Sequence, residues 1–129
     1  SGNPLAMAAG NVMLNLLSES NVYGLLEKKS KKLCDGLQKN VLELGIPAQF
    51  TRVGSMFSMF FTNQKIENFD TVKTCDTEFF KRYFNALLEE GIYIAPSQFE
   101  VGFMSAIHSD EEIDQTIAAS LKALKIAVN

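Results

Sequence analysis

One carboxylate in this sequence is placed where proton chemistry is physically reasonable. Glu100 stands between Phe99 and Val101, and this mostly apolar run is bounded by Pro96 and Gly102. A carboxylate held among apolar side chains has a raised pKa and can transfer a proton or pair with an amine. The alternative is an exposed Glu on the polar side of a loop, and the residue types alone favour that alternative.

Other reactive side chains are few and isolated. Arg52 could bind a substrate carboxylate through a bidentate pair, although pairing with a surface acid is the simpler interpretation. His108, the single histidine, precedes a helix cap, where a structural or exposed role is favoured over a role beside a substrate cleft. Cys34 and Cys75 have neither C-x-x-C nor metal-ligand spacing, so we expect reduced thiols, no catalytic thiolate and no metal site.

The first residues have the features of a helix start. Asn3 suits the capping position and Pro4 the first helical position, where a backbone N–H is not needed. Taken from the residue types alone, this start is a helix cap and nothing more. Because the chain opens on such a cap without an initiator Met, we expect it to be part of a longer protein.

Apolar spacing predicts an α+β fold in a single domain over residues 1–129. Helices are expected at 4–17 and 22–44, from 76 until Gly91, and after a capping box made by Ser109 and Glu112. Residues 49–53 and 56–62, joined at Gly54 and Ser55, indicate two strands and a tight turn, or one strand bent at a bulge. Shorter strands are expected at 92–95 and 103–107, with a polar connection at 64–74. These elements predict a small antiparallel-rich sheet covered by helices.

Composition limits the classes of partner. The net charge is −3, which argues against nucleic acid. Five lysines of the second helix are interpreted as a solvated face: Lys28, Lys29, Lys31, Lys32 and Lys39. No run of 18 apolar residues and no signal peptide are visible, so we expect a cytoplasmic protein that does not span a membrane.

Four sequence blocks, in order, resemble one enzyme family. They are Ser1 to Gly10 (SGNPLAMAAG), Arg52 to Phe57 (RVGSMF), Phe60-Phe61-Thr62 with Asn68-Phe69-Asp70, and Ala95 to Phe103 (APSQFEVGF). Together they are similar to the glutamate-1-semialdehyde 2,1-aminomutases, within the class III aminotransferases that use pyridoxal phosphate. The first block alone indicates only the class, and the Pro-Ser-Gln-Phe-Glu segment adds much of the specificity.

The resemblance implies a fold and a function. The chain would be the C-terminal small domain of a homodimeric isomerase that converts glutamate-1-semialdehyde, a small amino-aldehyde, to 5-aminolevulinate in tetrapyrrole biosynthesis. It implies that Glu100 lies near the pyridoxal phosphate and faces the amino groups of the substrate. It also implies that Ser1, Gly2 and Asn3 lie near the cofactor phosphate of the partner subunit.

The sequence departs from the family in what it lacks. The lysine that binds the cofactor and the acid that holds its ring nitrogen lie in the family's large domain, and the threonine two residues ahead of Ser1 is missing here. We therefore expect the fragment alone to be inactive, and to self-associate through apolar surface that the large domain would cover. Two alternatives are the same domain of another class III transaminase and a free-standing α+β interaction module.

Overall fold

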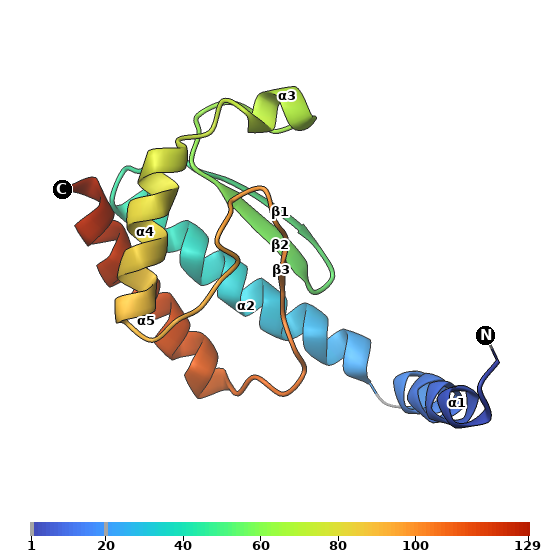
Figure 1. Cartoon of the computed structure of the whole chain (residues 1–129). Helices are drawn as coiled ribbons and strands as arrows, with labels where there is room; N and C mark the ends of the chain where they lie inside the picture. The colour runs from blue at the N-terminus through green and yellow to red at the C-terminus, as the bar shows by residue number, and fades with distance from the viewer. Residues whose placement is uncertain (1, 20) are drawn as a thin grey trace.

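The computed structural model describes residues 2–19 and 21–129, and they form an α+β fold (Figure 1). The helices are α1 (Pro4–Glu19), α2 (Val22–Glu43), α3 (Phe69–Val72), α4 (Thr77–Glu89) and α5 (Asp110–Val128). The strands are β1 (Gln49–Val53), β2 (Met56–Phe60) and β3 (Gly102–Phe103), in an antiparallel sheet of order β1-β2-β3. The predicted fold class is therefore confirmed.

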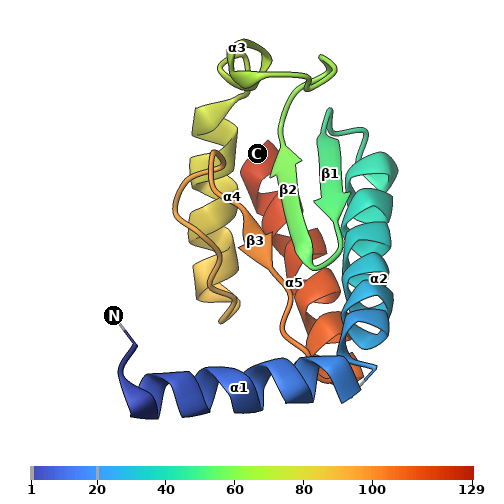
Figure 2. The same cartoon turned by 90° about the vertical axis from the view of Figure 1, so that its right-hand side faces the viewer.

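Three helices cover one face of this sheet. Figure 2 shows α5 behind the strands, between α2 and α4, and it packs against both helices. The core forms where apolar stripes meet: Leu87 of α4 and Leu124 of α5 are almost completely buried. Ala119, Ala123 and Ala127 recur at intervals of four on α5, so small side chains allow the neighbouring helices to approach closely.

The β1–β2 hairpin has the tight turn that the sequence predicts. Gln49 pairs with Phe60 at one end and Val53 with Met56 at the other. Gly54 has a φ of 57°, a left-handed conformation that glycine adopts without steric cost. The turn therefore fixes the register in which the two strands pair.

Two predicted strands and one loop differ from the sequence-based expectation. Residues 92–95 do not pair with the sheet, because the N–H of Ile92 donates to the carbonyl of Leu87 at 2.9 Å and closes the end of α4. The strand expected at 103–107 is reduced to β3, after which the chain turns. The polar connection at 64–74 contains α3, which begins at a capping box of Asn68 and Thr71.

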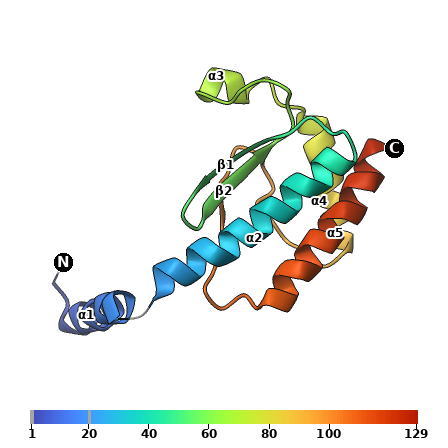
Figure 3. The same cartoon turned by 180° about the vertical axis from the view of Figure 1, so that it is seen from behind.

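Helix α1 has no buried residue and extends away from the other elements, as Figure 3 shows from behind. Its exposed large apolar side chains include Leu5, Met7, Val12, Met13, Leu14 and Leu16. Within the described residues, no helix combines the length and the apolar character that a membrane crossing requires.

Candidate functional site

The connection between α4 and α5, residues 91–109, runs beside α4 and contributes β3 to the edge of the sheet (Figure 2), and it is called the strap here. A cavity of about 600 Å³ lies between the strap, β2 and helices α2, α4 and α5. Apolar side chains such as Leu33, Phe57 and Ile113 form much of its wall, while Gln98 and Glu100 contribute from the strap. The candidate acid of the sequence analysis therefore borders the main cavity of the fold.

Glu100 is exposed at this cavity. Its N–H donates to the carbonyl of Ser97 at 3.1 Å, so the two residues close a turn. Phe99 and Val101 are themselves 49% and 46% exposed, and they lie beside the carboxylate rather than enclosing it. In this chain Glu100 is thus an exposed loop acid. Its carboxylate would be enclosed by apolar groups only if another protein surface covered this loop.

Gln98 is a residue that the sequence analysis did not single out. Its side chain is only 4% exposed, yet neither Nε2 nor Oε1 has a hydrogen-bond partner among the described residues. A buried donor or acceptor without a partner costs about 1–3 kcal/mol. The sequence gives no sign of this burial, because a polar residue in a loop between Ser97 and Phe99 is ordinarily expected at the surface.

The proposed anion site at the chain start is only partly described. Ser1 lies outside the described residues. Gly2 and Asn3 are exposed, and Asn3 Oδ1 accepts hydrogen bonds from the N–H groups of Leu5 at 2.9 Å and Ala6 at 3.3 Å. The predicted cap is therefore confirmed, and it occupies the N–H groups that a phosphate would need. No residue of α1 lines the cavity, so the structure does not bring this end of the chain together with Glu100.

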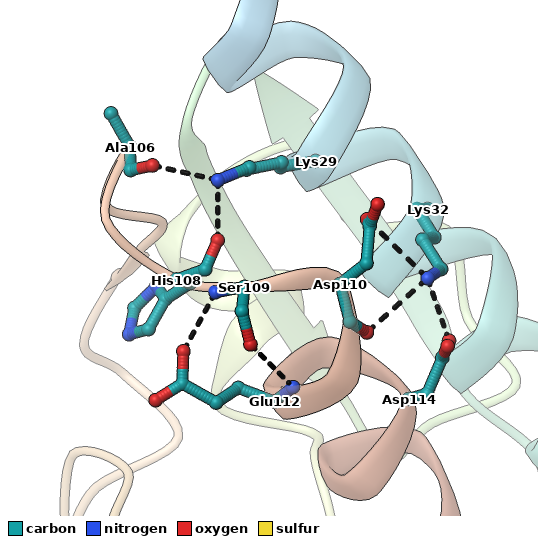
Figure 4. A network of polar contacts seen from close by, with 8 residues as sticks. All are labelled: Lys29, Lys32, Ala106, His108, Ser109, Asp110, Glu112 and Asp114. Atoms are coloured by element: carbon teal, nitrogen blue, oxygen red, sulfur yellow. Dashed lines mark hydrogen bonds and ion pairs between the residues drawn. The ribbon is translucent and has the colours of Figure 1, made fainter.

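A polar network fixes the far end of the strap (Figure 4). Lys29 Nζ donates to the carbonyl of Ala106 at 2.7 Å and to the carbonyl of His108. His108 Nδ1 accepts from the N–H of Ser105 at 3.2 Å, and His108 also lines the cavity, so a structural hydrogen bond and a position beside the cavity occur together. This network corrects one prediction, because Lys29 faces the strap instead of forming part of a purely solvated face.

Helix α5 begins at the predicted capping box. Ser109 Oγ accepts from the N–H of Glu112 at 3.1 Å, and Glu112 Oε2 accepts from the N–H of Ser109 at 2.7 Å. The hydrogen bond from the backbone of Ser109 is the main cause that lowers the pKa of Glu112. Lys32 adds an ion pair to Asp114 at 2.8 Å, which is a second correction to the solvated-face prediction.

Arg52 already has a carboxylate partner. Its two terminal nitrogens contact the two carboxylate oxygens of Glu27 at 2.7 Å each, and the guanidinium lowers the pKa of Glu27. Arg52 is not among the residues that line the cavity. The simpler interpretation, a surface ion pair, is confirmed.

The remaining reactive groups lie apart from the cavity. Cys34 and Cys75 are buried free thiols, and burial raises the pKa of both. In the described ranges 2–19 and 21–129, His, Cys, Asp and Glu nowhere gather in a group of three suited to a metal ion. The residues that line the cavity include no lysine. The cavity lining therefore does not supply the amine that the carbonyl of pyridoxal phosphate requires.

Comparison with known proteins gives one consistent result. No family model matches the chain. Glutamate-1-semialdehyde 2,1-aminomutase 2 of Brevibacillus brevis is 53% identical over 127 residues, covering 98% of this chain and 30% of that protein. The resemblance noted in four sequence blocks thus extends along the whole chain. The chain spans about 30% of the length of the curated relatives it matches.

Solved structures agree on the fold. An omega-transaminase from Sphaerobacter thermophilus matches with a TM-score of 0.80 at 24% identity, over 99% of this chain and 29% of that one. A glutamate-1-semialdehyde aminomutase from Pseudomonas aeruginosa PAO1, solved in complex with PMP, matches with a TM-score of 0.73 at 16% identity, over 82% and 23%. At these identities the likeness shows the fold alone.

Proposed function

We propose that this chain is the C-terminal small domain of a glutamate-1-semialdehyde 2,1-aminomutase, a pyridoxal-phosphate-dependent isomerase. The observation that carries the proposal is the 53% identity to such an enzyme over nearly the whole chain. The parent would move an amino group within one molecule, converting glutamate-1-semialdehyde to 5-aminolevulinate for tetrapyrrole biosynthesis. The fragment itself is expected to be inactive, since no lysine lines its cavity and the family's cofactor-binding lysine lies in the large domain.

In this proposal the chain contributes the carboxylate of Glu100 and one side of the substrate cleft. The parent's large domain supplies the cofactor-binding lysine, and bound pyridoxal phosphate supplies the electron sink that amino transfer requires. Covering the strap would remove water from around Glu100, because Phe99 and Val101 already flank it. A carboxylate kept from bulk water beside the substrate can exchange a proton with its amino groups, and this is the role proposed for Glu100.

The exposed apolar surface supports a larger assembly. Tyr93, Phe103 and Ile107 of the strap are 74%, 67% and 86% exposed, and α1 adds a second apolar surface. Apolar patches of this kind commonly mark protein contacts. We propose that the strap faces the large domain and that α1 lies near the subunit boundary of a cytoplasmic homodimer.

Substitution of Glu100 in the full-length parent tests the proposal. Glu100→Gln should lower kcat by about 100-fold or more, the usual contribution of a general acid or base, with little change in cofactor affinity. The matched control is Glu89→Gln, an exposed acid near the end of α4. Unchanged turnover in the Glu100 variant would reject the assigned role.

The requirement for an external amino acceptor distinguishes the proposed aminomutase from its main alternative, a transaminase. An aminomutase converts the semialdehyde without any external amino acceptor, whereas a transaminase requires one. The fold match to an omega-transaminase makes this the relevant comparison. The third possibility, an interaction module, requires a start codon directly upstream of Ser1, which sequencing of the coding DNA would detect.

A further inference from the structure

Gly102 lies directly opposite Phe57 in the antiparallel pair formed by β2 and β3. Side chains of paired residues lie on the same face of a sheet, so the ring of Phe57 shares the space that a side chain at position 102 would take. A Cβ atom at position 102 would lie 2.7 Å from Cζ of Phe57 and 3.0 Å from each of the two Cε atoms. Non-bonded carbon atoms pack at about 3.5–4.0 Å, so the ring leaves no room for any residue larger than glycine.

This position requires glycine for space and not for backbone conformation. The described glycines with a left-handed φ are Gly2, Gly45, Gly54 and Gly91, and Gly102 is not one of them. An alanine could therefore adopt the same backbone, and the cost of its methyl group would come from the crowding alone. A glycine within a strand often marks a close approach, and an aromatic ring packed across an edge glycine helps to fix the register of the strands.

The ring of Phe57 is itself held in place. It packs against the buried cluster of Leu33, Leu37, Met104 and Ile113. Close-packed side chains transmit strain, because a ring that moves aside loses contacts with several neighbours at once. A methyl group added at position 102 would therefore displace the backbone of β3 as well as the ring.

The candidate acid lies two residues before this contact. The N–H of Glu100 donates to the carbonyl of Ser97, and only Val101 separates this turn from β3. The pairing of Gly102 with β2 is the first attachment of the strap to the sheet after the turn. Phe57, Gly102 and Glu100 all line the same cavity. The position of β3 against the ring therefore decides where Glu100 enters that cavity.

We propose that Gly102 is a positioning residue for Glu100. Because it has no side chain, the ring of Phe57 packs on its backbone, and this contact fixes β3 and the acid that precedes it. Gly102 itself would not touch the substrate and would act only through Glu100. The catalytic consequence rests on the proposed function, whereas the packing contact and the placement of Glu100 do not.

The first test compares Gly102→Ala, Phe57→Leu and the double variant in this chain. Gly102→Ala should lower the melting temperature by roughly 3 °C or more, because crowding in a packed site is destabilising. Leucine lacks the three ring atoms that crowd the methyl group, so Gly102→Ala should lower the melting temperature much less in the Phe57→Leu background. Equal losses in the two backgrounds would overturn the proposed contact.

The amide resonances of residues 97–100, measured by NMR in this chain, show whether the turn moves. They should shift in Gly102→Ala and return toward their original values in the double variant. Gly36→Ala is the matched control, because a Cβ there would lie 2.4 Å from Cδ1 of Ile117, and neither residue lines the cavity. Unchanged resonances at 97–100 in Gly102→Ala, or equal shifts there in Gly36→Ala, would overturn the positioning role.

Kinetics of the full-length parent test the catalytic consequence. Gly102→Ala should lower kcat by about 10- to 100-fold with little change in KM, as expected for a misplaced catalytic group, and should shift the limb of the pH–kcat profile that Glu100→Gln abolishes. Adding Phe57→Leu should restore most of the lost kcat, and Gly36→Ala should leave the profile unchanged. An unchanged profile in Gly102→Ala would overturn the catalytic consequence. A parent without aminomutase activity would overturn the proposed function, while the resonances of residues 97–100 would still decide whether Gly102 places Glu100.

Discussion

The two halves of the strap differ in how many of their hydrogen bonds and packing contacts this chain itself supplies. Residues 104–109 are tied down: Met104 is buried, its N–H donates to the carbonyl of Ser55 at 2.9 Å, and Lys29 holds two further carbonyls. Within residues 92–101, only Ile92 makes a backbone hydrogen bond to another element. Ile92 and Ile94 pack against the core, while Tyr93 and Phe99 are exposed. Apart from Ile107, which is 86% exposed, the first half is completed by contacts within the chain, whereas the second half has the surface of an unfinished interface.

Because of this difference, one half of the strap is expected to serve the stability of the fold and the other half to serve function. The completed half fixes where the strap joins α5, and it does so with contacts that any folded copy of this chain must make. The unfinished half carries Glu100, the candidate acid of the larger protein. Substitutions in the first half should therefore act on the folding of this chain, and substitutions in the second half should act on the parent.

The largest effect is expected from Met104→Ala. Met104 packs with Leu33, Leu37 and Ile113, and a buried methionine cut back to alanine loses contacts and leaves a cavity. The free energy of unfolding of this chain should fall by about 2–5 kcal/mol, measured by urea denaturation. A loss below about 1 kcal/mol would show that this half of the strap is not anchored as described.

Lys29→Met should have the next largest effect. The substitution keeps most of the apolar stem but removes an ammonium that donates to the carbonyls of Ala106 and His108. Hydrogen bonds to charged groups contribute about 1.5–3 kcal/mol, so a loss in that range is expected. Lys28→Met, on the exposed side of the same helix, should stay within about 0.5 kcal/mol. Equal effects of the two variants would contradict the role of Lys29.

A comparison of the helix caps with Lys29 shows which contacts could be predicted from the sequence. The caps at Asn3 and Ser109 were predicted because a cap involves residues two or three positions apart. The bond from Lys29 to Ala106 joins residues 77 positions apart, and its lysine resembles its solvated neighbours in sequence. Local spacing cannot show that, of the five lysines, Lys29 faces the strap and Lys32 faces α5.

The same limit applies to the candidate site. Glu100 stood out because its neighbours are apolar, but only the fold shows that Phe99 and Val101 lie beside it on the surface. Gln98 was missed because burial of a loop residue depends on what packs over it. The strand expected at 92–95 was wrong because the end of α4 takes the N–H of Ile92.

A smaller effect and a pH dependence are expected at the cap of α5. Ser109→Ala should cost about 1 kcal/mol, since it removes the acceptor for the N–H of Glu112. The folded state lowers the pKa of Glu112 below its ordinary value of 4.5, so the carboxylate stabilises the fold above that pH. This contribution is lost as pH falls through the lowered pKa. Glu112→Gln should therefore reduce the acid dependence of stability, and denaturation curves at pH 3 to 7 would measure it.

The smallest effect should come from Val101→Thr, which keeps the shape of a side chain that is 46% exposed in the unfinished half. In this chain the free energy of unfolding should change by less than about 0.5 kcal/mol, because water already reaches the site. In the parent a covering surface would desolvate the added hydroxyl, and a larger loss is expected there. A negligible change in both proteins would mean that nothing covers Val101, and the contrast between the two halves of the strap would then lose its functional meaning. A large loss already in this chain would mean instead that the half described as unfinished is part of the core.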